Sequence, residues 1–348
     1  MSPLILFMFL SSLGLGTTLT FMSSHWFLAW MGLEINTLAI IPLMTQPRHP
    51  RAVEAATKYY ITQAAAAALI LFAGATNAWI TGQWDISSNL HPFPASLLIM
   101  ALSLKMGLAP LHFWFIEVLQ GLGLMTGLML ATWQKLAPFI LMCQIMPNNP
   151  QLMTTLGVLS ILIGGWGGLS QVQLRKILAY SSIAHFGWMI LVMQFNIQLA
   201  LLALTIYLPM TFTTFMIFKI NHSTTLNMLA ISWSKTPIMT AIAPLILLSL
   251  GGLPPLSGFI PKWMIIQEMT KQELPLIASM AALGALLSLY FYVRITYALS
   301  LTASPNNTAT MTPWRLQMYP SVLPMAISSG LSLMLLPLAP SIITLLTP

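Results

Sequence analysis

Four ionisable side chains lie within long apolar stretches of this sequence, and each could hold or pass a proton. Glu34, Lys105 and Lys135 lie near the middle of such stretches, and Lys262 closely follows an interruption rich in glycine and proline. A charge at the centre of a bilayer costs roughly 2.5–3.5 kcal/mol on insertion scales, so buried charges in membrane segments are functional candidates by default. One carboxylate with three lysines indicates proton or ion transfer.

We expect Lys105 to pair with Glu34. The two side chains have opposite charge and lie in the same part of the chain, and each would otherwise be an unpaired buried charge. A nearby carboxylate favours the protonated form of a buried lysine, whereas desolvation favours the neutral form. Separating the pair would therefore release the Lys105 proton toward Lys135, so that ion-pair geometry controls the basicity of the lysine.

His112 and His185 are further candidates for proton transfer, because histidine changes its charge near neutral pH. A neutral histidine that is hydrogen-bonded between helices explains both positions equally well. Glu117 is expected to be an ordinary carboxylate at the membrane interface rather than a site of proton uptake. Glu268 and Lys271 are one helical turn apart and are expected to form a surface pair.

The composition is that of a membrane protein with α-helical spans. Of the 348 residues, 57% are hydrophobic and only 5% are charged, whereas a soluble domain carries about 25% charged residues. The apolar runs are continuous rather than alternating, which argues against a membrane β-barrel. The net charge of +7 does not indicate nucleic-acid binding, because no basic cluster is interleaved with aromatic residues. The single cysteine, Cys143, excludes thiolate clusters, and no metal or nucleotide motif is present.

Runs of about 20 apolar residues predict eleven membrane helices. We expect them at 3–22, 25–44, 54–80, 95–116, 124–146, 151–170, 174–194, 198–219, 237–270, 275–300 and 322–346. The fourth and ninth should be discontinuous, because Gly107–Pro110 and Gly251–Gly258 interrupt them. The first basic residue is Arg48, so the first segment is expected to be a retained helix rather than a signal peptide.

The distribution of basic residues predicts the orientation of these helices. On one side of the membrane the count places Arg48, Arg51, Lys58, Arg175, Lys176, Lys219, Lys235, Arg294 and Arg315, and on the other only Lys271 with Asp85 and Glu273. The positive-inside rule assigns the basic side to the cytoplasm or the mitochondrial matrix. The N-terminus is then expected inside, and an odd number of spans leaves the C-terminus outside.

The two interruptions resemble each other in sequence. Gly107-Leu108-Ala109-Pro110-Leu111 matches Gly252-Leu253-Pro254-Pro255-Leu256, and each interrupted segment is the fourth in a block of five. A repeat with an odd number of spans must be inverted in the membrane, and inverted repeats with broken helices are typical of transporters. We therefore expect one membrane domain, 1–348, with inverted five-helix repeats at 1–146 and 151–300 and an extra C-terminal helix at 322–346.

Several motifs together resemble the antiporter-like proton-pumping membrane subunits of respiratory complex I. The similarity covers essentially the whole chain and is carried by HWFLAWMGLEINTLAIIPLM at 25–44, KMGLAPLHFWFIEVLQG at 105–121, WQKLAP at 133–138, LRKILAYSSIAHFGWM at 174–189 and LSLGGLPPLSGFIPKW at 248–263. The resemblance implies that Glu34 and Lys105 form the coupling ion pair and that Lys135 is the central relay. Lys262 would lie near the exit side, although some paralogues carry glutamate there.

The same resemblance implies that His112 and His185 lie on or near a hydrophilic axis. The resemblance further implies that full-length relatives have three more N-terminal helices, which this chain is expected to lack. The surface that they leave would be covered by neighbouring membrane subunits, including other antiporter-like subunits, or by lipids such as cardiolipin. NADH, FMN, iron–sulfur clusters and ubiquinone would be bound by other subunits, and this chain would bind no redox cofactor or metal.

The sequence thus predicts a proton-translocating subunit in the inner mitochondrial membrane, with its N-terminus in the matrix and its C-terminus in the intermembrane space. A stand-alone cation/proton antiporter of the same fold is one alternative, and co-purification with a large assembly would distinguish the two. A structural scaffold whose buried charges only lock helices together is another. A dry core around Lys105, Lys135 and Lys262 in every state would favour the scaffold.

Overall fold

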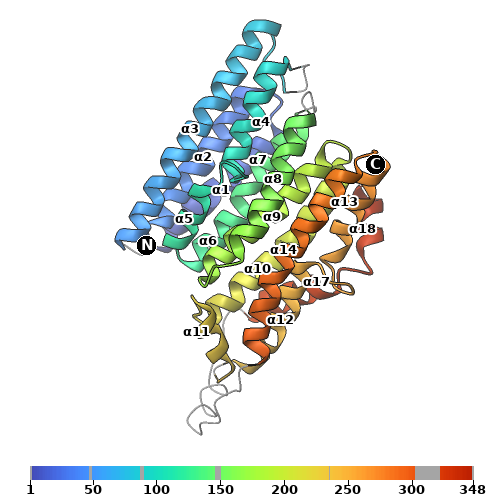
Figure 1. The fold of residues 1–348 in the computed structure, drawn as a ribbon. Coiled ribbons are helices and arrows are strands. Elements are labelled where there is room, and N and C mark those ends of the chain that lie inside the picture. The colour runs from blue at the N-terminus through green and yellow to red at the C-terminus, as the bar shows by residue number, and fades with distance from the viewer. Residues whose placement is uncertain are drawn as a thin grey trace. The chain divides into compact units, whose positions relative to one another are not determined.

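The structure is a computed structural model that describes residues 2–46, 49–86, 90–145, 150–234, 236–301 and 322–346. Within these ranges every regular element is a helix (Figure 1), as predicted. The chain divides into two compact units, Met1–Gly157 and Val158–Pro348. Three basic residues used for the orientation, Arg48, Lys235 and Arg315, lie outside the described residues.

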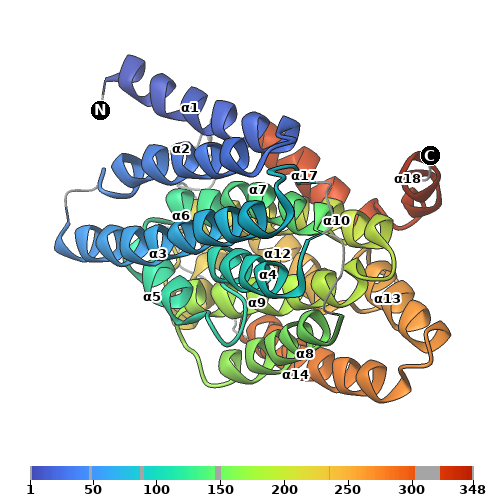
Figure 2. The same ribbon diagram turned by 90° about the horizontal axis from the view of Figure 1, so that it is seen from above.

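The first unit consists mainly of seven helices. They are α1 (Pro3–Met22), α2 (Trp26–Met44), α3 (Pro50–Thr81), α4 (Pro92–Met106), α5 (Phe113–Gly121), α6 (Leu124–Ala131) and α7 (Trp133–Gln144), and α8 (Pro150–Gly168) crosses into the second unit. Helices α1, α2 and α3 lie side by side in this order (Figure 2). Helices α3 and α7 each pack against both α2 and α4, so they join the helix that carries Glu34 to the helix that carries Lys105.

The second unit is built around α9 (Leu174–Met193) and α10 (Ile197–Ile220), which are its most deeply buried spans. The other elements are α11 (Leu226–Ile231), a short 3-10 helix (Ser232–Ser234), α12 (Pro237–Gly251), α13 (Phe259–Lys271), α14 (Pro275–Ser300), α17 (Val322–Met334) and α18 (Ala339–Leu346). Helix α10 packs against α9, α12, α13 and α17. The helices that carry His185 (α9) and Lys262 (α13) therefore both contact α10.

Eight of the predicted spans are long, apolar helical segments in the described parts of the chain. The remaining three predicted spans are pairs of shorter helices: α4 with α5, α12 with α13, and α17 with α18. The predicted interruptions of the fourth and ninth segments are confirmed. Two further interruptions were not predicted. Thr132 leaves helical geometry between α6 and α7, and its hydroxyl donates to the Leu128 carbonyl; in the last segment, Pro337 cannot continue a helix.

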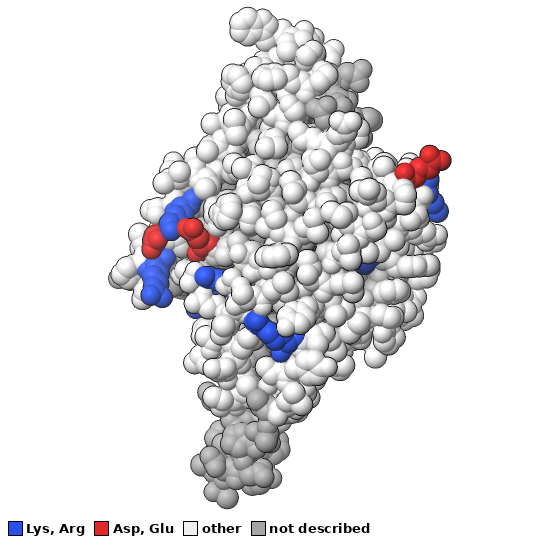
Figure 3. All heavy atoms as spheres, viewed as in Figure 1, with Lys and Arg blue, Asp and Glu red and all other residues white. Residues whose placement is uncertain are grey.

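The surface is that of a chain surrounded by lipid. Figure 3 shows one face on which charged side chains gather in a few small patches on an otherwise uncharged surface. Large apolar side chains point outward along the helices, for example Met22, Trp79 and Leu276, which are 86%, 90% and 75% exposed. Such a surface cannot be covered by water alone, which agrees with the predicted membrane spans.

The two principal breaks have the same backbone geometry. After α4 the N–H of Leu108 donates to Ser103 and that of Gly107 to Leu104, and after α12 the N–H of Leu253 donates to Leu248 and that of Gly252 to Ser249. Both patterns are Schellman motifs, which end a helix with a left-handed residue. Gly107 and Gly252 are those residues, with φ of 73° and 82°. The predicted correspondence between the two interruptions is confirmed at this level.

The helices that precede the two breaks also make close contacts at corresponding positions. A Cβ atom on Gly16 of α1 would lie 2.9 Å from the Gly32 carbonyl oxygen on α2, and one on Gly164 of α8 would lie 2.9 Å from the Tyr180 carbonyl oxygen on α9. Gly16 and Gly164 are as far apart along the chain as Gly32 and Tyr180 are. Isolated antiparallel bridges, His25 with Asp85 and Gln173 with Thr225, then close corresponding loops in each unit.

Candidate functional site

Lys105 and Lys135 line one cavity in the first unit. Its other lining residues come from α2, α3, α5, α6 and α7: Leu33, Asn36, Thr37, Tyr59, Gln63, Trp114, Phe115, Leu130, Gln134 and Pro138. The cavity volume is about 10 Å³, which is the room that one water molecule requires. The structure therefore brings together two lysines that are distant in sequence, and it surrounds the space between them with amide and hydroxyl groups.

The Lys105 side chain is buried, and its ammonium nitrogen has no hydrogen-bond partner among the described residues. The lysine lies in the last turn of α4, where helix carbonyls carry partial negative charge. One of these carbonyls, that of Leu104, accepts from the Trp114 Nε1 group at 3.1 Å. The break thus supplies Trp114 as a cap for the helix end and leaves the ammonium of Lys105 without a direct partner.

Glu34 does not contact Lys105 directly in this structure. Its half-buried carboxylate accepts from the Thr37 hydroxyl at 3.0 Å, and the ion pairs of the described chain are all elsewhere. Glu34 nevertheless interacts electrostatically with both Lys105 and Tyr59. Helices α3 and α7 each pack against both α2 and α4, so the helices that carry the two charges share neighbours.

The ammonium of Lys135 lies over an aromatic ring. Its Nζ atom is 4.0 Å from the centroid of the Phe115 ring, and both side chains are buried. The face of an aromatic ring attracts a cation, by about 2 kcal/mol or more when the pair is desolvated. Because Phe115 belongs to the half-helix that follows the break, the position of α5 bears directly on the charge of Lys135.

Lys262 and His185 share a second cavity, within the second unit. It is about 20 Å³ in volume, room for one or two water molecules, and it is also lined by Trp188, Met189, Ala203, Ile206, Tyr207, Met210, Gly258, Pro261 and Ile265. The rings of His185 and Tyr207 are 5.4 Å apart between centroids. This arrangement places an imidazole, a phenol and an ammonium around one small, mainly apolar space.

Lys262 caps the end of the broken helix. Its Nζ donates to the Gly251 carbonyl at 2.7 Å and to the Leu250 carbonyl at 3.2 Å. Gly252 permits this approach, because a Cβ atom at that residue would lie 2.8 Å from Lys262 Cδ and its φ of 82° disfavours other residues. The negative end of the α12 dipole and two carbonyl groups thus stabilise the ammonium in place of a carboxylate.

His112 lies within the break itself and does not line the cavity of Lys105 and Lys135. Its Nδ1 atom is 3.2 Å from the Pro110 carbonyl oxygen, and its ring is 4.4 Å from that of Phe113 between centroids. Of the six candidate residues, Lys105 and Lys135 therefore line the cavity of the first unit, and Lys262 and His185 line that of the second. Glu34 and His112 belong to the first unit and line neither cavity.

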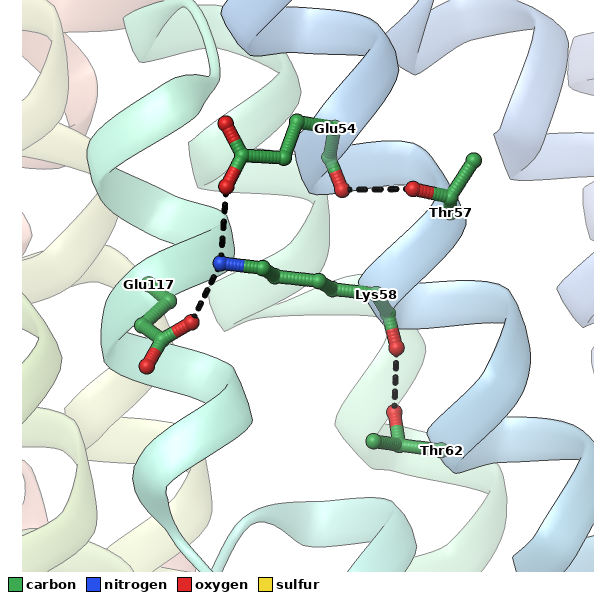
Figure 4. Close-up of polar contacts among 5 residues, drawn as sticks. All are labelled: Glu54, Thr57, Lys58, Thr62 and Glu117. Atoms are coloured by element: carbon green, nitrogen blue, oxygen red, sulfur yellow. Dashed lines mark hydrogen bonds and ion pairs between the residues drawn. The ribbon is translucent and has the colours of Figure 1, made fainter.

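The acidic residues near the helix ends form exposed ion pairs. The Lys58 Nζ atom is 2.8 Å from a Glu54 oxygen and 2.7 Å from a Glu117 oxygen, which joins α3 to α5 (Figure 4). The predicted surface pair of Lys271 with Glu268 is confirmed at 3.8 Å. Exposed pairs of this kind contribute little to stability. Within the described residues, no group of three or more His, Cys, Asp or Glu side chains could hold a metal ion.

Sequence reasoning did not identify Thr37, Tyr59, Phe115 or Tyr207 as site residues. The two tyrosines are buried, and each lines the lysine cavity of its own unit. Tyr59 and Tyr207 are as far apart along the chain as Gly16 and Gly164 are. The match between the two breaks does not reveal this pair, because Gly107 and Gly252 are three residues closer along the chain than Tyr59 and Tyr207.

Comparisons with known proteins give one consistent result. Residues 23–288 match the family described as NADH:quinone oxidoreductase/Mrp antiporter, TM, and residues 289–343 match that described as NADH dehydrogenase subunit 2 C-terminus. The chain is 75% identical to NADH-ubiquinone oxidoreductase chain 2 of Gadus morhua, covering 100% of both, and 62% identical to that of Tetraodon nigroviridis, covering 99% of both. It resembles a chain in the structure of respiratory complex I from Thermus thermophilus with bound aureothin, at 27% identity and a TM-score of 0.83, covering 97% of this chain and 80% of that one.

Proposed function

This chain belongs to the NADH-ubiquinone oxidoreductase chain 2 family, and we propose that it passes protons through two lysine cavities. It is a membrane subunit of complex I, the respiratory-chain NADH dehydrogenase of mitochondria. That complex couples electron transfer from NADH to ubiquinone to proton translocation across the inner mitochondrial membrane. The relay residues are proposed from the geometry of this chain.

The observation that carries the proposal is the shared cavity of Lys105 and Lys135. Two buried lysines border a space of about 10 Å³ with polar side chains around it, and such a space can hold a water molecule when two to four polar groups surround it. A protonated Lys105 can donate to that water, and the water can donate to a neutral Lys135.

Glu34 is proposed to set the charge of Lys105. Its carboxylate interacts electrostatically with Lys105 without forming a salt bridge. A movement that brings the carboxylate closer favours the ammonium, and a movement away favours proton release. The predicted ion pair is thus one state of a variable contact, and the structure has the separated geometry.

Lys262 and His185 are proposed to continue the relay in the second unit. The small cavity that they share can hold water between the imidazole and the ammonium. The carbonyl groups of α12 stabilise the protonated lysine, and the imidazole can accept or donate a proton near neutral pH. His112 remains a secondary candidate, since it contacts a backbone carbonyl beside the first break.

Other subunits are proposed to bind NADH, FMN, the iron–sulfur clusters and ubiquinone. The single Cys143 cannot supply the several thiolates that an iron–sulfur cluster requires. We further propose inverted repeats over 1–146 and 151–300, a matrix N-terminus and a C-terminus in the intermembrane space. Neighbouring antiporter-like subunits, with lipids such as cardiolipin, would cover the outward apolar surface of α1.

A map of the intact complex at a resolution that shows ordered water tests this function. Water density beside Lys105, Lys135 and Lys262 would support the relay. Dry cavities in every catalytic state would instead favour a scaffold whose buried charges hold helices together. Isolation of active transporter free of the other subunits would favour a stand-alone antiporter of the same fold.

A further inference from the structure

Thr37 contacts the Glu34 carboxylate and lines the cavity of Lys105, and we propose that its hydroxyl positions that carboxylate relative to the cavity. The inference deepens the proposed relay and rests on it. In this role Thr37 is a positioning residue: it holds the Glu34 carboxylate in place and does not itself carry the transferred proton.

The hydroxyl of Thr37 has two possible acceptors on the same helix. Its Oγ1 atom is 2.8 Å from the backbone carbonyl oxygen of Glu34 and 3.0 Å from the carboxylate oxygen Oε2 of the same residue. A threonine hydroxyl carries only one proton, so it donates to one of these acceptors at a time. Thr37 can therefore adopt two hydrogen-bonding states, one that holds the carboxylate and one that leaves it free.

Thr37 also reaches the lysine cavity. The residue is 5% exposed and lines the same small space as Lys105 and Lys135. While its hydroxyl donates to Glu34, its oxygen can accept a hydrogen bond from a water molecule in that space. Such a water would connect the Glu34 carboxylate, through the Thr37 hydroxyl, to the space that Lys105 and Lys135 line.

The internal repeat gives an independent reason to assign importance to this position. The separation between Thr37 and His185 equals that between Gly16 and Gly164 and that between Tyr59 and Tyr207. His185 lies on α9 and lines the cavity of Lys262, just as Thr37 on α2 lines the cavity of Lys105. In both units the same helical position thus presents a polar side chain to the buried lysine.

Three substitutions in the intact complex test the inference. Thr37→Val keeps the branched shape and removes the hydroxyl, Thr37→Ser keeps the hydroxyl, and Thr20→Val is the matched control. Thr20 is also buried, but its hydroxyl donates only to the Thr17 carbonyl, at 2.7 Å. Protons moved per NADH oxidised and the rate of ubiquinone reduction are measured in sealed vesicles, per assembled complex.

We expect Thr37→Val to lower coupled turnover or proton yield by about tenfold, because a hydrogen bond to a charged group changes an equilibrium by at least that factor. Thr37→Ser should restore most of the loss, and Thr20→Val should behave as the wild type. If Thr37→Val does not assemble, Thr37→Ala provides the same comparison without the added methyl group.

Normal pumping by Thr37→Val, or a Thr37→Ser variant as impaired as Thr37→Val, would overturn the inference. The second outcome would show that packing rather than the hydroxyl is what matters. Lys105→Met, measured in parallel, separates this inference from the proposed function. A Lys105→Met complex with normal pumping rejects the relay itself, whereas an impaired one beside a normal Thr37→Val rejects only the role of Thr37.

Discussion

The ammonium of Lys262 lies 2.7 Å from the carbonyl oxygen of Gly251, the last residue of α12. The break in this helix therefore supplies the negative partner of a buried lysine that forms no ion pair with a carboxylate among the described residues. A small displacement of the α12 end would change how firmly Lys262 holds its proton. In the first unit the corresponding helix end is capped by Trp114, and Lys105 retains a free ammonium.

Gly252→Ala should reduce pumping by displacing the Lys262 side chain. The new Cβ atom would lie 2.8 Å from Lys262 Cδ, and the left-handed backbone adds about 1–2 kcal/mol of strain. Gly82→Ala is the matched control, because its φ is 70° and a Cβ atom there meets nothing within 4 Å. Both variants should lose thermal stability, and only Gly252→Ala should lose proton yield. Equal proton yields in the two would contradict the capping role.

Phe115→Leu should slow coupled turnover, because it removes the aromatic face beneath the Lys135 ammonium. The lost attraction is about 2 kcal/mol for a desolvated pair, or more than tenfold in the protonation equilibrium of the lysine. Phe113→Leu, two residues away and 68% exposed, controls for a general loss of aromatic packing in α5. Turnover measured against pH compares the two variants, and indistinguishable profiles would show that the ring serves packing alone.

Gly16→Ala should separate α1 from α2 and destabilise the first unit by about 1–3 kcal/mol. Its Cβ atom would lie 2.9 Å from the Gly32 carbonyl oxygen, which belongs to rigid backbone and cannot move aside. Gly14→Ala is the control on the same helix, since a Cβ atom there meets nothing within 4 Å and alanine favours helix. The thermal midpoint of the purified complex is the measurement. A midpoint for Gly16→Ala at or above that of Gly14→Ala would show that the crossing is not tight.

Glu34→Gln should lower coupled turnover while leaving assembly intact. The amide keeps the shape of the side chain and its ability to accept from Thr37, but it removes the charge that interacts with Lys105. Proton yield and ubiquinone reduction in vesicles are compared with those of the wild type. Unchanged turnover would indicate that the carboxylate only holds helices together.

The buried charges and the two principal breaks could be predicted from sequence, because charge is rare within apolar segments and because glycine and proline occur together at each of these breaks. The partners of those charges could not. The predicted direct contact of Glu34 with Lys105 is not formed here, since α3 and α7 connect their helices. Phe115 and Thr37 are residue types that are common in membrane helices, and only the folded chain shows that they face a lysine.

The additional breaks illustrate the same limit. Thr132 lies in a segment that is apolar enough to span a membrane, and Pro337 lies in the predicted span 322–346, so hydropathy predicts continuity at both. Helix geometry at these residues depends on a hydroxyl-to-carbonyl bond in one case and a missing N–H group in the other. Neither effect changes the hydrophobic pattern from which the spans were predicted.

The proton yield of a complex that carries Lys105→Met tests the relay most directly. Methionine keeps the length and apolar stem of lysine but cannot carry a proton, so fewer protons should cross the membrane per NADH oxidised while the complex still assembles. Lys58→Met, at an exposed ion pair in the same unit, should pump normally. A Lys105→Met complex that moves as many protons per NADH as the wild type would contradict the account.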